Sequence, residues 1–153
     1  MSRIPALGML LAALAAVVVV SAPNAAAWTP EDARLSACDF GREIGTYDHA
    51  ALDGYFQRVL DRSTGNFADE FSAAAPALKS SMREMRVRGW VESIECGGIG
   101  GDLLRQRVLI NLVQVRTNAA GPAPSLEHLT LTATLDNVWG RWLVSELDSA
   151  KRF

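Results

Sequence analysis

The stretch Leu126-Glu127-His128-Leu129-Thr130-Leu131-Thr132-Ala133-Thr134-Leu135-Asp136 alternates between apolar and polar side chains. Successive side chains of a β-strand point to opposite faces, so Leu129, Leu131, Ala133 and Leu135 fall on one face and Thr130, Thr132 and Thr134 on the other. One apolar and one polar face are typical of an antiparallel sheet that covers a core on one side only. The pattern therefore predicts a half-buried strand over residues 126–136.

The neighbouring segments extend this sheet. We expect three further strands, over residues 90–96, 103–117 and 141–147. The segments between the strands are rich in glycine, proline or asparagine and are expected to be loops and turns: residues 97–101, 118–124 and 137–140. Short connections join antiparallel neighbours, so the sequence predicts a four-stranded antiparallel meander.

The residues before the sheet carry apolar side chains at helical spacing. We expect three helices, over residues 30–40, 52–60 and 67–85. Thr29 and Asp48 are the expected N-caps of the first and second helices, and Pro76 is expected to kink or interrupt the third. Helices followed by an antiparallel meander predict one α+β domain over residues 28–153.

Composition and charge exclude several classes of function. The chain has 153 residues, of which 49% are hydrophobic and 21% charged, as in a globular domain and unlike a disordered tail. Fifteen Lys and Arg oppose seventeen Asp and Glu, so no basic field is present to hold nucleic acid. Two Cys and two His fall short of a usual structural metal site, and we expect neither a metal nor another cofactor.

The N-terminal segment is typical of an export signal. Residues 4–29 carry no charge, and Ala25-Ala26-Ala27 matches the small-residue end of a signal peptide. Cleavage after Ala27 would leave a chain that starts at Trp28. The alternative is an uncleaved anchor, because residues 4–22 are long enough to span a hydrocarbon core of about 30 Å. Either way, we expect the domain to be exported, and to be either secreted or held at the plasma membrane within the cell envelope.

The cysteines Cys38 and Cys96 are a pair in a chain that we expect to be exported. Disulfides form and persist in oxidising compartments, so a bridge between these two residues is the expected state. Two separate buried thiols are the alternative.

Five short segments resemble one family when taken in order. They are Thr46-Tyr47-Asp48, Thr64-Gly65-Asn66-Phe67, Gly89-Trp90-Val91, Val113-Gln114-Val115-Arg116-Thr117-Asn118 and Gly140-Arg141-Trp142-Leu143-Val144-Ser145. Together they resemble the actinobacterial Mce-associated membrane proteins, in which Mce abbreviates mammalian cell entry. The order of helices and strands is similar to the cone-shaped, cystatin-like fold of nuclear transport factor two and ketosteroid isomerase. The periplasmic domain of type IV secretion assembly factors has the same plan.

The resemblance implies a curved sheet and a non-enzymatic accessory or scaffold role beside an Mce-type importer of lipids or sterols. The partners that it implies are the importer subunits, and it supplies no catalytic motif. A secreted lipid-binding domain of the same fold is the first alternative, and an isomerase or cyclase is the second.

Two groups of side chains are candidates for binding. A curved sheet over three helices can leave an apolar cavity for a lipid ligand. The residues that would line this cavity are Phe67, Phe71, Met82, Trp90 and Trp142. Arg83, Arg86 and Arg88 are candidates for contact with an anionic headgroup or an acidic partner. Packing in the core and complementation of a helix dipole are the respective structural alternatives.

Two further clusters carry polar side chains. Tyr47, Asp48, His49 and Tyr55 are the residue types that acid–base chemistry at the mouth of a cone would need, but helix capping and core packing explain them, and we expect no catalytic residue. The polar strand face with Thr130, Thr132 and Thr134 is either solvated or the edge of a homodimer contact.

Overall fold

The computed structural model describes residues 28–150, and the expected signal or anchor at residues 1–27 lies outside the described residues. The helices and strands, in chain order, are α1 (Glu31–Gly45), β1 (Tyr47–Asp48), α2 (Leu52–Leu60), α3 (Gly65–Glu84), β2 (Arg88–Gly101), β3 (Arg105–Thr117), β4 (Ser125–Val138) and β5 (Arg141–Ser149). Within residues 28–150, no helix is long and apolar enough to cross a membrane.

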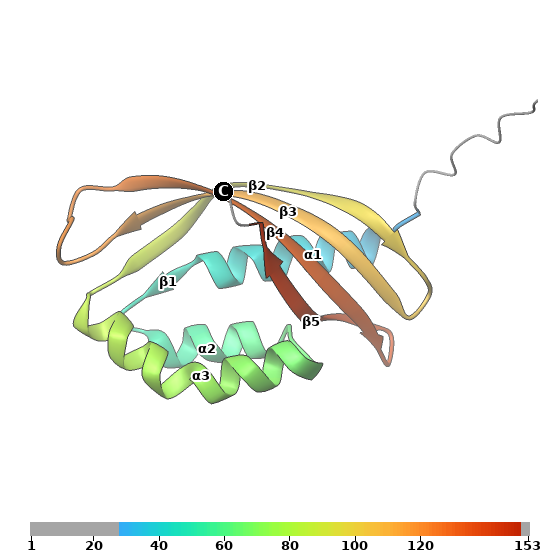
Figure 1. The fold of residues 1–153 in the computed structure, drawn as a ribbon, viewed down its shortest axis with the longest axis horizontal. Coiled ribbons are helices and arrows are strands. Elements are labelled where there is room, and N and C mark those ends of the chain that lie inside the picture. The colour runs from blue at the N-terminus through green and yellow to red at the C-terminus, as the bar shows by residue number, and fades with distance from the viewer. Residues whose placement is uncertain (1–27, 151–153) are drawn as a thin grey trace, which may run out of the picture.

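The five strands form one antiparallel sheet in the order β1-β2-β3-β4-β5. The sheet is curved, with α1 along its concave side and α2 and α3 as a second layer that closes the cone (Figure 1). The strand predicted over residues 126–136 is confirmed as part of β4, and Ala133 and Leu135 are fully buried against the helices, but Thr134 between them is buried as well. The fifth strand, β1, was not predicted, because two residues paired with Gly89 and Arg88 leave no alternating pattern.

The three helices are confirmed, but the first is longer than expected. The predicted end at Phe40 is wrong, since α1 continues to Gly45. Gly41 serves close packing instead of a helix end, because a Cβ on it would lie 2.7 Å from Cδ1 of Ile94. The expected side-chain caps are also absent: Pro30 and Ala51 occupy the N-cap positions of α1 and α2 without a capping hydrogen bond.

Pro76 does not interrupt the third helix, which runs unbroken from Gly65 to Glu84. Its ring lies on the exposed side of α3, where the carbonyl group that loses its hydrogen bond can bind water. Gly65, which a turn ending the second helix would explain at the level of sequence, instead begins α3, with a positive φ of +54°. A left-handed residue there turns the chain between the two helices.

The glycine run at residues 97–101 is not the predicted hairpin loop. It belongs to β2, and the connection to β3 lies at residues 102–104. A Cβ at Gly98 would overlap the hydroxyl of Thr29, so glycine is required for the N-terminal segment to lie against this strand. The glycine run therefore leaves room for Thr29, which is distant in sequence, to lie against β2. A rule based on local turn residues does not detect such a contact.

Two connections hold the layers together. The Cys38–Cys96 disulfide, with a Cα–Cα distance of 5.8 Å, joins α1 to β2. At the other edge of the sheet, the amide of Val144 donates to the carbonyl of Arg62, and the amide of Thr64 donates to the carbonyl of Val144. The α2–α3 connection thus covers the middle of the β5 edge, and the expected disulfide is present.

Candidate functional site

The interior of the cone is filled by aromatic rings. Phe40 meets Phe67 edge-on at 5.3 Å between ring centroids, and Phe67 stacks on Phe71 at 5.5 Å. Phe56 stacks on Phe71 at 4.7 Å and meets Tyr55 at 5.2 Å. Such pairs stabilise a core beyond their buried area. The space between the helices and the sheet, where a ligand of this fold would sit, is therefore packed with side chains.

The structure does not bring the five expected cavity residues to one cavity. Phe67 and Phe71 are in contact, and Met82, three turns further along α3, packs against another part of the core. Trp142 is buried and lines a cleft against α1, whereas Trp90 is 41% exposed and lines a different cleft. Trp90 points away from the helices, because its neighbour Val91 faces Gly45 of α1.

A first surface cleft, of about 360 Å³, lies between β1, the start of α2 and the start of β2. It contains Tyr47 and Asp48, two of the residues considered for acid–base chemistry. Both carboxylate oxygens of Asp48 are occupied: Nε of Arg88 donates to Oδ2 over 2.9 Å, and the amide of Ala50 donates to Oδ1 over 2.9 Å. The Arg88 guanidinium, followed by the Ala50 amide, lowers the pKa of Asp48.

The pKa of Asp48 is shifted in the direction opposite to that of a general acid. Such an acid needs a carboxyl group with a raised pKa, whereas Asp48 is held as a carboxylate. The phenol of Tyr55 donates to the carbonyl of Ile44 over 3.0 Å, and burial raises its pKa further above neutrality. Burial likewise raises the pKa of Tyr47. His49 is adjacent to Asp48, with Nδ1 3.4 Å from Oδ1. The cluster thus offers an ion pair and two neutral phenols.

The basic cluster at the end of α3 is largely paired. Arg88 binds Asp48, and Arg83 lies 3.8 Å from Asp53, which Lys79 also contacts at 2.8 Å. Among residues 28–150, no acidic side chain pairs with Arg86. Arg86 has a positive φ of 49° where the chain leaves α3 for β2. The three arginines therefore do not form a free basic patch.

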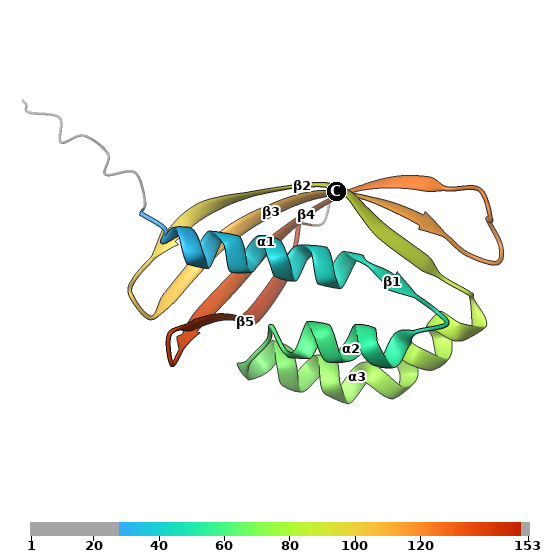
Figure 2. The ribbon, with the colours of Figure 1, turned by 180° about the vertical axis from the view of Figure 1, so that it is seen from behind.

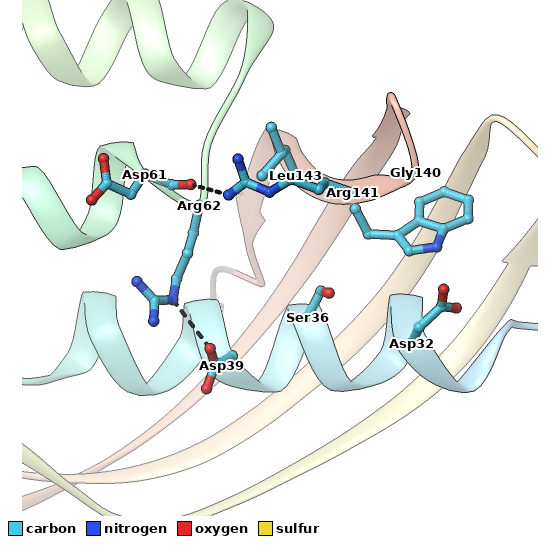
Figure 3. Close-up of a pocket in the computed structure, with 9 residues that line it drawn as sticks. Asp32, Ser36, Asp39, Asp61, Arg62, Gly140, Arg141 and Leu143 are labelled. Carbon is cyan, nitrogen blue, oxygen red and sulfur yellow. Dashed lines mark hydrogen bonds and ion pairs between the residues drawn. The ribbon is translucent and has the colours of Figure 1, made fainter.

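A second surface cleft, of about 400 Å³, lies between α1, the end of α2 and the start of β5 (Figure 3). One face of α1 supplies Asp32, Ser36 and Asp39 at helical spacing. Nε of Arg62 donates to Oδ2 of Asp39 over 3.2 Å, and Arg141 donates to the carbonyl of Asp61 over 3.1 Å. Both guanidinium groups are thus tied to the walls, and Ser36 lies between them and Asp32.

This cleft was missed at the level of sequence. Its walls come from three segments that are far apart in the chain, and no local motif links them. The single available signal was the spacing of Asp32, Ser36 and Asp39, which predicts one polar stripe on the first helix. The cleft is open and its walls carry charged side chains, so it is not built to enclose an apolar ligand.

The polar face of β4 is only partly solvated. Thr134 is buried, while Oγ1 of Thr130 donates to Oδ1 of Asn111 over 2.9 Å on the face away from the helices. Its use as a homodimer contact stays a prediction.

No protein-family model matches the chain. No curated protein matches it in sequence. Among the described residues, no group of three or more His, Cys, Asp or Glu side chains is placed to hold a metal ion.

Solved structures do match the fold. An IcmL-like type IV secretion system protein from Legionella pneumophila is 12% identical, with 81% of this chain and 94% of that chain covered and a TM-score of 0.61. The periplasmic domain of DotI is 11% identical over 82% of this chain and 97% of that chain, with a TM-score of 0.60. An Ntf2-like protein involved in plasmid conjugation is 11% identical over 78% of this chain and 48% of that chain, with a TM-score of 0.56. The chain therefore has the cone-shaped α+β fold of Ntf2-like proteins.

Proposed function

We propose that this chain is an exported, non-catalytic accessory domain that acts as a scaffold within a protein complex of the cell envelope. The observation that carries the proposal is the closed interior: Phe40, Phe56, Phe67 and Phe71 fill the cone that an enzyme or lipid carrier of this shape would keep open. The surface instead offers open clefts with ion pairs in their walls. A domain of this kind contributes shape and contacts to an assembly.

The fold neighbours support this type of role. They include a protein described as belonging to a type IV secretion system and a periplasmic domain. The export signal expected at residues 1–27 and the Cys38–Cys96 disulfide agree with a place outside the cytoplasm.

Within the envelope, we assign the chain to an Mce-type importer of lipids or sterols, on the strength of the five sequence segments. Their positions in the structure are architectural: Tyr47 pairs with Gly89 across the β1–β2 edge, Gly65 turns the chain into α3, and Trp142 packs into the core. The second candidate is a subunit of a type IV secretion or conjugation machine, which the fold of the neighbours favours.

Recovery of partners from the native host tests the proposal. The full chain carries a C-terminal tag, is extracted from membranes and is purified with everything bound to it, and mass spectrometry identifies the recovered proteins. Mce importer subunits support the assignment, and secretion or conjugation subunits support the second candidate. Recovery of the chain alone from the soluble exported fraction contradicts the scaffold role.

A matched pair of variants shows whether the cleft in Figure 3 is the docking site. Ser36→Trp fills the cleft, whereas Ser72→Trp adds the same side chain to the exposed surface of α3. We expect Ser36→Trp to lower partner recovery and Ser72→Trp to leave it unchanged, at equal melting temperatures. Equal recovery from both variants would place the docking site elsewhere.

A further inference from the structure

One end of the domain carries large apolar side chains in water. The exposed fraction is 64% for Trp28, 73% for Leu103, 71% for Leu104 and 100% for Trp139, and Ile99 is 39% exposed. We call these five residues the apolar tip. Single exposed apolar residues are ordinary, but several of this size at one end mark an interaction surface.

Three segments that are distant in sequence form the apolar tip. The amide of Asn137, beside the β4–β5 turn, donates to the carbonyl of Leu104 in the β2–β3 connection over 2.8 Å. Thr29 lies against Gly98 of β2, which places the first described residues at the same end. Figures 1 and 2, seen from opposite sides, both show the two hairpin turns and the start of α1 together at this end.

Trp139 is held outward at a conformational cost. It occupies the first position of a two-residue hairpin turn, with a φ of 52°, and Gly140 follows with a φ of 83°. Turns with two positive φ values favour Asn-Gly, and a bulky residue in this region is an outlier. Because Trp139 is fully exposed, its indole adds nothing to the core, so the strain is not offset within the domain.

Several polar groups around the apolar tip are paired, although among the described residues the Asp102 carboxylate has no cationic partner. Both Leu104 and Arg105 donate their backbone N–H groups to Oδ1 of Asp102, over 2.8 and 2.9 Å. Arg105 forms a two-point pair with Asp136, at 2.7 and 3.1 Å. Paired charges and capped backbone groups lose less on leaving water than free ones do. These hydrogen bonds and the Arg105–Asp136 pair can therefore persist when the apolar tip enters a less polar medium.

We propose that the apolar tip is seated in the headgroup region of a lipid bilayer, where it fixes the orientation of the domain. The sequence immediately before the tip supports a bilayer as the occupant: residues 1–27 precede Trp28, and residues 4–22 form an uncharged stretch of membrane-spanning length. Indole rings concentrate at the membrane–water interface. Exposed tryptophan and leucine side chains insert at the headgroup boundary and bind by the apolar area that they bury.

The test uses the full chain in vesicles of phosphatidylglycerol and phosphatidylcholine, with phosphatidylcholine either plain or brominated on its acyl chains. Bromine quenches indole fluorescence only within a few ångströms. In the background Trp28→Phe/Trp90→Phe, the remaining indoles are Trp139 and the buried Trp142. Adding Trp139→Phe gives a matched chain in which Trp142 is the single remaining indole. The difference in emission between the two chains is therefore the emission of Trp139.

A second comparison places an indole at the opposite end of the sheet. Gly121 lies in the exposed β3–β4 loop, and Gly121→Trp in the Trp28→Phe/Trp90→Phe/Trp139→Phe chain gives the control. The proposal predicts that Trp139 emission shifts to shorter wavelength on vesicles and is lost with brominated lipid, while the residue-121 indole stays in water. It also predicts that Leu103→Ser/Leu104→Ser reduces the quenching of Trp139.

Three results would overturn the proposal. Trp139 emission that stays at the aqueous wavelength means that the tip does not touch lipid. A shift without quenching by bromine means that protein covers it, either a second copy of this chain or its own N-terminal segment. Stronger quenching at residue 121 means that the opposite end faces the bilayer. Circular dichroism and an intact Cys38–Cys96 bridge verify folding in each variant. The partner-recovery experiment changes none of the tip residues, so either proposal can fail without the other.

Discussion

The backbone conformation of Trp139 lowers the stability of the domain, and a substitution at this single residue can measure the loss. Its φ of 52° belongs to a turn in which Asn is much easier to accommodate. We therefore predict that Trp139→Asn raises the free energy of unfolding by about 1 kcal/mol. Urea unfolding of the two chains provides the measurement.

The neighbouring residue supplies the control for this prediction. Gly140 has a φ of 83°, and Gly140→Ala introduces a Cβ into a conformation that L-residues avoid. We expect this change to destabilise the domain by about 1–2 kcal/mol. A loss of stability in Trp139→Asn would show that the indole makes stabilising contacts, contrary to its complete exposure.

Asp48 gives the domain a pH-dependent contribution to stability. The Arg88 guanidinium lowers its pKa in the folded state, so the pair stabilises the fold above the unfolded-state pKa of about 3.9 and loses this effect as pH falls through the folded-state pKa. We predict that Asp48→Asn is less stable than the parent chain at pH 7 and that the difference disappears in acid. Asp69→Asn, on the exposed surface of α3, is the control and should show no such trend in thermal unfolding.

At the scale of elements, the disulfide clamps α1 to the long β2 strand. Cys38 and Cys96 are separated by 58 positions, and closing a loop of this size restricts the unfolded chain. We predict that Cys38→Ala/Cys96→Ala lowers the free energy of unfolding by about 2–4 kcal/mol. Reductant should destabilise the parent chain to the same level and leave the variant unchanged. Equal unfolding of oxidised and reduced parent chains would show that the clamp is not needed.

The aromatic packing between α1, α2 and α3 is the second feature at this scale. Phe56 is 2% exposed and stacks on Phe71. We predict that Phe56→Ala costs about 3–5 kcal/mol because it opens a void in a packed core. If the interior is filled as described, a fluorescent fatty acid will not bind the parent chain. Saturable binding of this probe inside the parent cone would contradict the closed interior and favour the lipid-binding alternative.

An element could be predicted where a contiguous stretch of sequence determines it, and not where contacts with distant residues do. The β4 strand was predictable because Leu129, Leu131 and Ala133 alternate with threonines over a single stretch. Gly41 and the glycine run of β2 were misassigned because glycine also serves where two segments must approach closely. Those approaches involve Ile94 and Thr29, which lie far away in the sequence, so no local rule could find them.

At the scale of the whole molecule, the fold was predictable from element order, but its surfaces were not. The cleft of Figure 3 and the apolar tip each combine three separate segments, and neither leaves a contiguous motif. The two surfaces also have different chemistry. The cleft is open and has ion pairs in its walls, whereas the apolar tip suits lipid. We thus propose one surface for a membrane and another for an assembly.

Photo-crosslinking in the native host tests the central claim, the scaffold role, most directly. A photoreactive residue replaces Ser36 in the cleft or, as the control, Ser72 on α3, and crosslinked products from the membrane are identified by mass spectrometry. The scaffold role predicts crosslinks from position 36 to subunits of an envelope transport complex and none from position 72. Uncrosslinked chain from both positions, recovered alone in the soluble exported fraction, would contradict it.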